Sequence, residues 1–108
     1  MPWAVETLNE KVDAEVAALP SDMRARLVRI SKFIEAVGLP NVREPYVKHL
    51  EGPLWEMRMK GRDGISRALY VTAKGKRVVI VRVFVKKTQK TPRHEINQAL
   101  ARASEINE

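Results

Sequence analysis

The protein has 108 residues, a mass of 12.3 kDa and no cysteine, and its 20 Lys and Arg side chains outnumber 13 Asp and Glu to give a net charge of +7. A chain of this length supports one modest core, so we expect residues 1–108 to form a single domain. The lack of cysteine excludes disulfides and thiolate metal sites and favours a cytoplasmic location. The longest apolar run, Val78–Val81, is far shorter than the roughly 20 residues of a membrane-spanning helix.

The first part of the chain predicts a strand and two helices. Trp3–Leu8 alternates in polarity and predicts a short strand. Asn9 is expected to cap a helix that runs to Ala18. Ser21 is expected to cap a second helix, whose apolar stripe ends at Gly38.

The second part changes from a helical period to a period of two. Leu39–Pro45 contains two prolines and predicts a connecting loop. Three strands in a meander are predicted at Leu54–Lys60, Ile65–Thr72 and Arg77–Lys86. Thr91 is expected to cap a last helix that has Pro92 at its first position. The predicted fold class is α+β, an antiparallel sheet of three to five strands with two N-terminal helices and a C-terminal helix, and with one sheet face covered by helices.

Positive charge is concentrated in the second part of the chain. Residues 1–45 hold 6 basic and 7 acidic side chains, whereas residues 46–108 hold 14 and 6. Strict alternation puts Val79, Val81, Val83 and Val85 on one face of their strand, and Val78, Ile80, Arg82, Phe84 and Lys86 on the other. The outer sheet face is expected to carry Glu56, Arg58, Lys60, Arg82 and Lys86. Cations about 5 Å apart on neighbouring strands repel one another unless an anion lies between them, which predicts a phosphate-binding surface. A solvated outer face is the alternative.

Three segments carry motifs that resemble a known family. Val47–Arg58 holds Lys-x-Leu-x-Gly and Leu-Trp-Glu-x-Arg, Ser66–Tyr70 holds Arg-x-x-Tyr, and Phe84–Pro92 holds Phe-x-Lys-Lys-Thr-x-x-Thr-Pro. In combination they resemble the HigB-like branch of the RelE/ParE toxin superfamily, a group of phage-derived toxin-like proteins. The resemblance extends over nearly the whole chain.

The resemblance implies a RelE/ParE-like fold and the toxin of a type II toxin–antitoxin pair. Such a toxin cuts messenger RNA on the ribosome without a metal or other cofactor, and a cognate antitoxin, here expected to be a helix-turn-helix protein of the HigA type, silences it. The ribose 2′-OH attacks the adjacent phosphate. That reaction needs fixed positive charge on the phosphorane, a proton acceptor and a proton donor.

Position in the matching motifs suggests which cations act on the phosphate. Arg67 corresponds to the family's phosphate-clamping arginine, Arg58 to the basic residue of its first central strand, and Lys86 to a cation at the end of its last strand. Arg67 is expected to stabilise the transition state, because a planar guanidinium matches a pair of phosphate oxygens. Losing it should cost about 3 kcal/mol, or about a hundredfold in rate, and leave folding almost unchanged.

The proton-transfer groups are less clear from the sequence. Glu44 and Glu56 are the candidates for the general base, and Glu56 has the alternative role of a structural ion pair. Tyr70 has the opposite strand parity to Arg67, which favours a place in the core. The tyrosine or histidine that RelE-type relatives use near the carboxyl terminus is missing after His94, so the acid is unidentified.

Further basic residues are expected to contact RNA. These are Lys48, Lys60, Arg82, Lys87 and Lys90. Two other functions fit the same residues. A ParE-like DNA gyrase inhibitor shares the fold without nuclease activity, and a non-catalytic nucleic-acid-binding module would use the cations only to neutralise phosphates.

Overall fold

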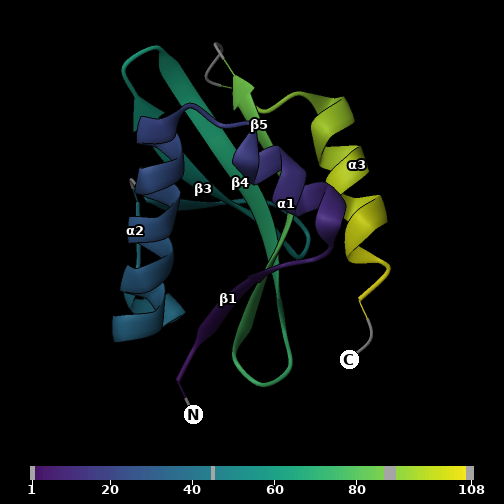
Figure 1. Ribbon diagram of the computed structural model, residues 1–108. Coiled ribbons are helices and arrows are strands. Elements are labelled where there is room, and N and C mark those ends of the chain that lie inside the picture. The colour runs from purple at the N-terminus through teal and green to yellow at the C-terminus, as the bar shows by residue number, and fades with distance from the viewer. Residues whose placement is uncertain (1, 45, 87–89, 107–108) are drawn as a thin grey trace.

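The computed structural model describes residues 2–44, 46–86 and 90–106. Within these ranges the strands are β1 (Ala4–Thr7), β2 (Val47–Glu51), β3 (Leu54–Gly61), β4 (Gly64–Ala73) and β5 (Arg77–Lys86), and the helices are α1 (Glu10–Ala17), α2 (Ser21–Val37) and α3 (Arg93–Ala103), with a short 3₁₀ turn at Leu39–Asn41 (Figure 1). The α+β prediction is confirmed. None of these helices combines the length and the apolar character needed to cross a bilayer.

The sheet is mixed rather than antiparallel. Its strand order is β1-β5-β4-β3-β2, and β1 runs parallel to β5 while every other neighbouring pair is antiparallel. Parallel neighbours cannot be joined by a tight turn, and β1 and β5 are separated along the chain by two helices and three strands. β2 was not predicted, because its apolar residues, Val47 and Leu50, are three positions apart and do not alternate.

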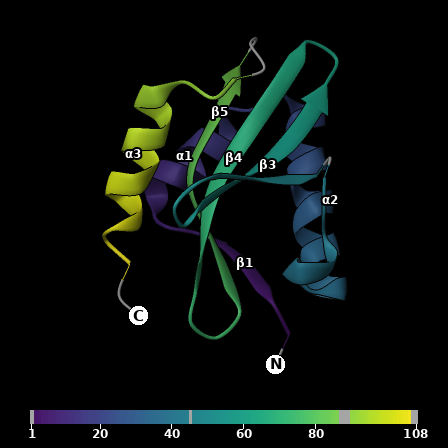
Figure 2. The same ribbon diagram turned by 180° about the vertical axis from the view of Figure 1, so that it is seen from behind.

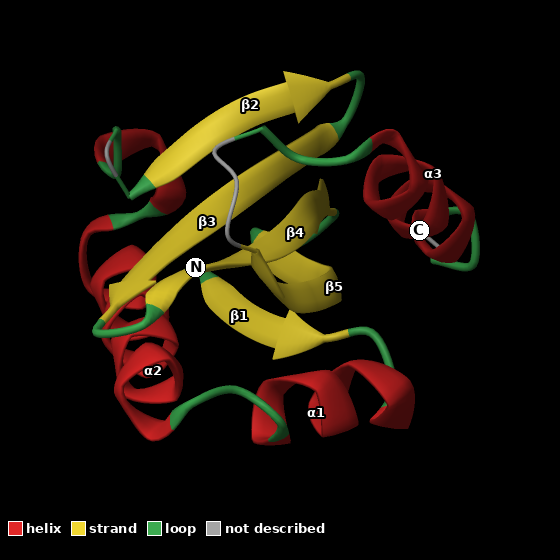
Figure 3. Ribbon diagram, turned by 90° about the horizontal axis from the view of Figure 1, so that it is seen from above, coloured by secondary structure: helices red, strands yellow, loops and turns green. Residues whose placement is uncertain are grey.

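Helices lie on both faces of the sheet, which corrects the expected arrangement with one covered face. α1 packs against β5 and α2 against β3, whereas α3 packs on the other side against β5, β4 and β3 (Figures 2 and 3). Two apolar clusters result, one beneath α1 and α2 and one beneath α3. Because α3 covers only part of its face, the rest is left for polar side chains.

Two helix caps differ from those expected. Asn9 caps α1 as predicted, with its side-chain oxygen accepting from the Val12 backbone N–H at 3.2 Å. The residue before α2 is Pro20 and the one before α3 is Pro92, and neither Ser21 nor Thr91 is the cap. The Thr91 hydroxyl instead reaches into the sheet, where it bonds Glu56 and Arg67.

A bulge in β5 changes which of its side chains share a face. Leu69 of β4 pairs with Arg82 and Tyr70 pairs with Ile80, so Val81 is an extra residue. Before the bulge Ile80 belongs to the α2-side cluster, and after it Val83 does. The predicted grouping of Val81 with Val83 is therefore wrong, and Val81 joins Phe84 beneath α3.

Arg82 forms ion pairs with helices on both faces of the sheet. It contacts Glu95 of α3 at 2.8 Å and Glu15 of α1 at 2.9 Å, and Arg102 of α3 also contacts Glu15 at 2.9 Å. The hydrogen bonds that Arg82 donates to Glu95, together with the charge of Glu15, raise the pKa of Arg82, although burial opposes them. The side chain that was expected to bind RNA is thus held by carboxylates from both layers.

Replacing Arg82 should destabilise the fold much more than replacing a surface arginine. Arg82→Ala leaves Glu95, which is buried, without its main partner, and we expect it to lower the free energy of unfolding by about 2–3 kcal/mol. Arg77→Ala is the matched control, because its pair with Glu6 is 40% and 42% exposed, and it should cost less than about 1 kcal/mol. Urea unfolding measures both. Equal losses would contradict a structural role for Arg82.

Candidate functional site

The face of the sheet that α3 only partly covers carries most of the predicted site. Cross-strand pairing arranges the side chains of this face in three rows. The first row is Lys48, Glu56, Leu69 and Arg82, the second is Arg58, Arg67 and Phe84, and the third is Lys60, Ile65 and Lys86. We call the set of Lys48, Glu56, Arg58, Lys60, Arg67 and Lys86 the basic face. The predicted cations of β2, β3, β4 and β5 therefore lie on one face of the sheet.

The centre of the basic face is a cluster of four side chains. Glu56 accepts a hydrogen bond from Arg58 Nε at 2.8 Å, and Arg67 Nε lies 3.7 Å from the same carboxylate oxygen. The Thr91 hydroxyl donates to the other Glu56 oxygen at 2.8 Å and accepts from Arg67 Nη1 at 2.9 Å. The carboxylate thus neutralises one of two guanidinium charges that would otherwise repel across the β3–β4 pair.

Arg67 is inside the protein rather than on its surface. Its side chain is fully buried, whereas the clamp expected from the sequence has to be exposed to its phosphate. Burial lowers the pKa of Arg67, the Glu56 charge opposes that shift and the Arg58 charge adds to it. The Glu56 carboxylate and the Thr91 hydroxyl hold the buried Arg67 guanidinium in place. Arg67 in turn fixes the position of the Glu56 carboxylate.

Arg58 is the arginine of this cluster that solvent reaches. Its side chain is 33% exposed, against 1% for Glu56. The hydrogen bond to Glu56 uses only Nε, and among the described residues the terminal amino groups of Arg58 have no acceptor. These two groups form the guanidinium fork that matches a pair of phosphate oxygens.

Lysines surround this centre. Lys48, Lys60 and Lys90 are exposed, and Lys86 is half-buried. Lys60 and Lys86 are separated by the strand that carries Ile65, so their backbones are about 10 Å apart. Lys87 lies outside the described residues.

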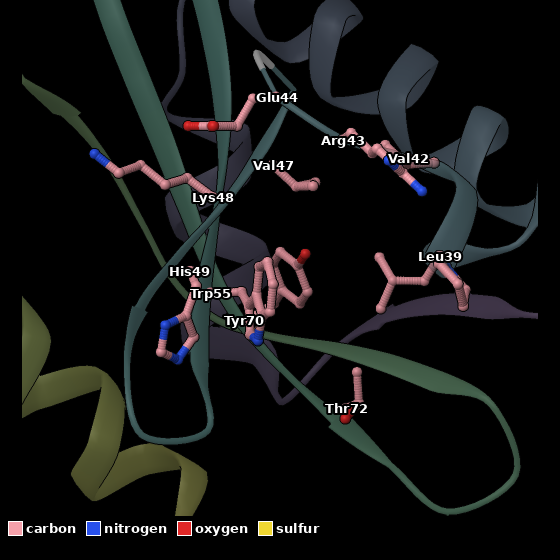
Figure 4. Close-up of a pocket in the computed structure, with 11 residues that line it drawn as sticks. Leu39, Val42, Arg43, Glu44, Val47, Lys48, His49, Trp55, Tyr70 and Thr72 are labelled. Carbon is pink, nitrogen blue, oxygen red and sulfur yellow. The ribbon is translucent and has the colours of Figure 1, made fainter.

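The two candidate bases have different surroundings. Glu56 is enclosed by the cluster described above, which agrees with the structural ion pair that the sequence left open. Glu44 is exposed in the loop before β2, and its carboxylate extends to the same side of β2 as the Lys48 ammonium group (Figure 4). The two carboxylates therefore belong to different environments, one enclosed and one open to water.

Thr91 is a member of this cluster that the sequence did not predict. Thr91 was interpreted as a helix cap, although its place in the Phe-x-Lys-Lys-Thr-x-x-Thr-Pro motif was a signal of a further role. Tyr70 is buried on the opposite sheet face, as its parity predicted. In the described part of the chain, no group of three or more His, Cys, Asp and Glu side chains is arranged to hold a metal ion.

Comparison with known proteins agrees with this architecture. The E. coli toxin RelE, in a mutant form in the free state, has a TM-score of 0.66 and 19% sequence identity over 94% of this chain and 98% of its own. A chain of the archaeal RelE–RelB complex from Pyrococcus horikoshii OT3 has a TM-score of 0.57 and 25% identity over 79% of this chain and 96% of its own. No curated protein sequence matches the chain.

A family model gives a direct assignment. The model for phage-derived Gp49-like proteins, also called DUF891, matches residues 14–104, which is most of the chain and includes α2, the last four strands and α3. With the RelE toxin fold established by the two solved structures, this match shows that the chain belongs to the Gp49-like family of phage-derived proteins.

Proposed function

We propose that this protein is the toxin of a toxin–antitoxin pair and that it cuts messenger RNA on cytoplasmic ribosomes. The similar solved structures are those of a RelE toxin and of a RelE–RelB complex, which supports a toxin with a protein partner. The observation that carries the nuclease assignment is the exposed guanidinium of Arg58 on the basic face, fixed from behind by the buried Glu56.

Arg58 is the group that we propose for transition-state stabilisation. Its Nε is bound to Glu56 and its terminal amino groups are open, so it can meet the charge that develops on a phosphorane without first reorganising. Lys48, Lys60 and Lys86 are spread over the same face and would neutralise the flanking phosphates. In this proposal Arg67 is a positioning residue, because it holds Glu56 and touches no substrate.

The chemical step rearranges bonds within the RNA, with a group of this chain as the proton acceptor and water as the proton donor. The ribose 2′-oxygen forms a bond to the adjacent phosphorus while the bond to the 5′-oxygen breaks, which leaves a 2′,3′-cyclic phosphate and a 5′-hydroxyl. The proton of the 2′-OH passes to the acceptor, and the departing 5′-oxygen takes a proton from water. We propose Glu44 as the proton acceptor, because it is exposed and extends to the same side of β2 as Lys48 (Figure 4).

Mapping of RNA ends tests the proposed function. The protein is incubated with translating ribosomes and, separately, with DNA gyrase and relaxed plasmid. We expect new RNA ends with 5′-hydroxyl groups that depend on ribosomes, and unchanged supercoiling. Inhibited supercoiling without RNA cleavage would replace the proposal with the gyrase-inhibitor function. RNA binding without either effect would replace it with a non-catalytic binding module.

The proposed partner is an antitoxin encoded next to this protein. A helix-turn-helix antitoxin of the HigA type would place the chain in the HigB-like branch. The net positive charge favours an acidic segment in that partner. Growth arrest on overexpression, with rescue by the neighbouring reading frame, is the expected result.

A further inference from the structure

A pocket lies on the sheet face opposite to Arg58, beside the edge strand β2 (Figure 4). Its volume is about 730 Å³, which is in the range of small-molecule sites, about 300–1,000 Å³. The rings of Trp55 and Tyr70, which are cross-strand partners, form one wall, and the chain from Leu39 to Glu44 contributes another. The proposed cleavage step involves neither ring.

The hydroxyl of Tyr70 is a buried polar group directed into this pocket. The side chain is fully buried, and among the described residues its hydroxyl has no hydrogen-bond partner. Figure 4 shows the hydroxyl between Val47 and Leu39. Burial raises the pKa of Tyr70, so the phenol stays protonated and keeps an O–H donor. Since buried hydroxyls in proteins nearly always have a partner, this donor is available to an acceptor atom of a molecule in the pocket.

Trp55 offers the pocket a flat aromatic surface. It is 39% exposed, and the His49 ring packs against it at 5.0 Å between centroids and 62° between planes. His49 is itself held by a 2.8 Å hydrogen bond between its Nε2 and the Gly52 carbonyl oxygen. The indole is therefore oriented by its neighbour and still accessible, as a ring that stacks on a planar ligand must be.

The edge strand β2 connects this pocket with the basic face. Lys48 pairs with Glu56 and so lies on the basic face, whereas His49, the next residue, pairs with Trp55 on the pocket side. No strand lies beyond β2 in the described sheet. An RNA strand bound on the basic face can therefore pass around this edge, and Arg43 supplies an exposed cation at the pocket.

We propose that the pocket binds one nucleobase of the RNA strand that the basic face holds. The base stacks on Trp55 and accepts a hydrogen bond from the Tyr70 hydroxyl, and its phosphate lies near Arg43 or Lys48. The identity of the strand as the cleaved messenger RNA rests on the proposed function. The chemistry of the pocket, a planar base with an attached phosphate, is shared by free nucleotides, and these serve as probes.

Fluorescence of Trp55 gives a direct measurement. The chain has two tryptophans, so Trp3→Phe makes Trp55 the single reporter. The probes are the four ribonucleoside monophosphates and a six-nucleotide RNA with 2′-O-methyl riboses, which lacks the attacking hydroxyl. We expect the oligonucleotide to quench Trp55 with saturation. Weaker quenching by mononucleotides would indicate that free nucleotides also enter, whereas quenching by the oligonucleotide alone would confine the site to a strand.

The Tyr70→Phe variant, made in the Trp3→Phe background, tests the hydroxyl. It should fold normally, because the lost hydroxyl has no hydrogen-bond partner in the part of the chain that the structure describes, and it should raise the dissociation constant about tenfold. Tyr46→Phe is the matched control, since this second tyrosine is 43% exposed and packs on Phe33 outside the pocket. It should leave binding unchanged. Equal effects of the two variants would overturn the proposed role of Tyr70.

Three results separate this proposal from the proposed function. If the labelled oligonucleotide binds by anisotropy and messenger RNA is cut on ribosomes, but no probe quenches Trp55, the pocket is not a base site and the nuclease assignment stands. Quenching that responds only to the antitoxin would likewise overturn the pocket proposal. If Trp55 is quenched and ribosomal messenger RNA stays intact, the proposed function fails and a nucleotide pocket remains.

Discussion

Arg58→Ala should lower messenger RNA cleavage about a hundredfold and leave the melting temperature nearly unchanged. The reason is that Arg58 is partly exposed and its open amino groups meet charge only when the phosphorane forms. Glu56 keeps Arg67 and Thr91 as partners in this variant, so no buried charge is left alone. Counting RNA ends from translating ribosomes, at equal amounts of folded protein, gives the rate.

Two further variants sharpen this prediction. Arg58→Lys keeps the charge but loses the planar fork, and it should recover only part of the rate. Arg26→Ala removes an arginine that is exposed on α2, away from the basic face, and should retain full activity. Full activity in Arg58→Ala would show that another group stabilises the transition state.

Arg67→Ala should lose activity by a different route, through loss of folded protein. The change removes a fully buried guanidinium and leaves the carboxylate of Glu56 inside the protein with fewer partners. We expect a loss of about 3–5 kcal/mol in the free energy of unfolding and a fall of roughly 15 °C in melting temperature. Thermal unfolding followed by circular dichroism measures the fall. This replaces the expectation from the sequence that folding would hardly change.

A double variant separates stability from activity at this position. Glu56→Leu combined with Arg67→Met replaces the buried ion pair with apolar side chains of similar size, and it should recover most of the lost stability. Cleavage should stay low, because Arg58 loses the carboxylate that orients it. Recovery of both stability and cleavage would contradict the positioning role of the Glu56–Arg67 pair.

The bulge in β5 and the role of Thr91 could not be predicted from sequence patterns. The bounds of β5 were predicted correctly, but one extra residue at Val81 reversed the parity of everything after it. Alternation cannot reveal a bulge when both faces of a strand are apolar, as in this run of valines. Thr91 directly precedes Pro92, so the local sequence predicts a helix cap. In the fold this part of the chain lies close to Glu56, and the Thr91 hydroxyl bonds to the Glu56 carboxylate instead.

The sequence by itself determined the α+β class, the order of the predicted helices and strands and the gathering of cations on one sheet face, because these follow from hydrophobic period and charge along a short stretch of chain. Only the tertiary structure decided that Arg67 is buried while Arg58 is partly exposed. Both arginines share one face, but Arg67 is bonded by Thr91, which lies 24 residues away along the chain. The pocket beside β2 also depends on the tertiary structure, because its walls come from segments that are far apart in the sequence, including the paired strands β3 and β4. Exposure is a property of packing between distant segments, and strand parity fixes the face of a side chain but not what covers it.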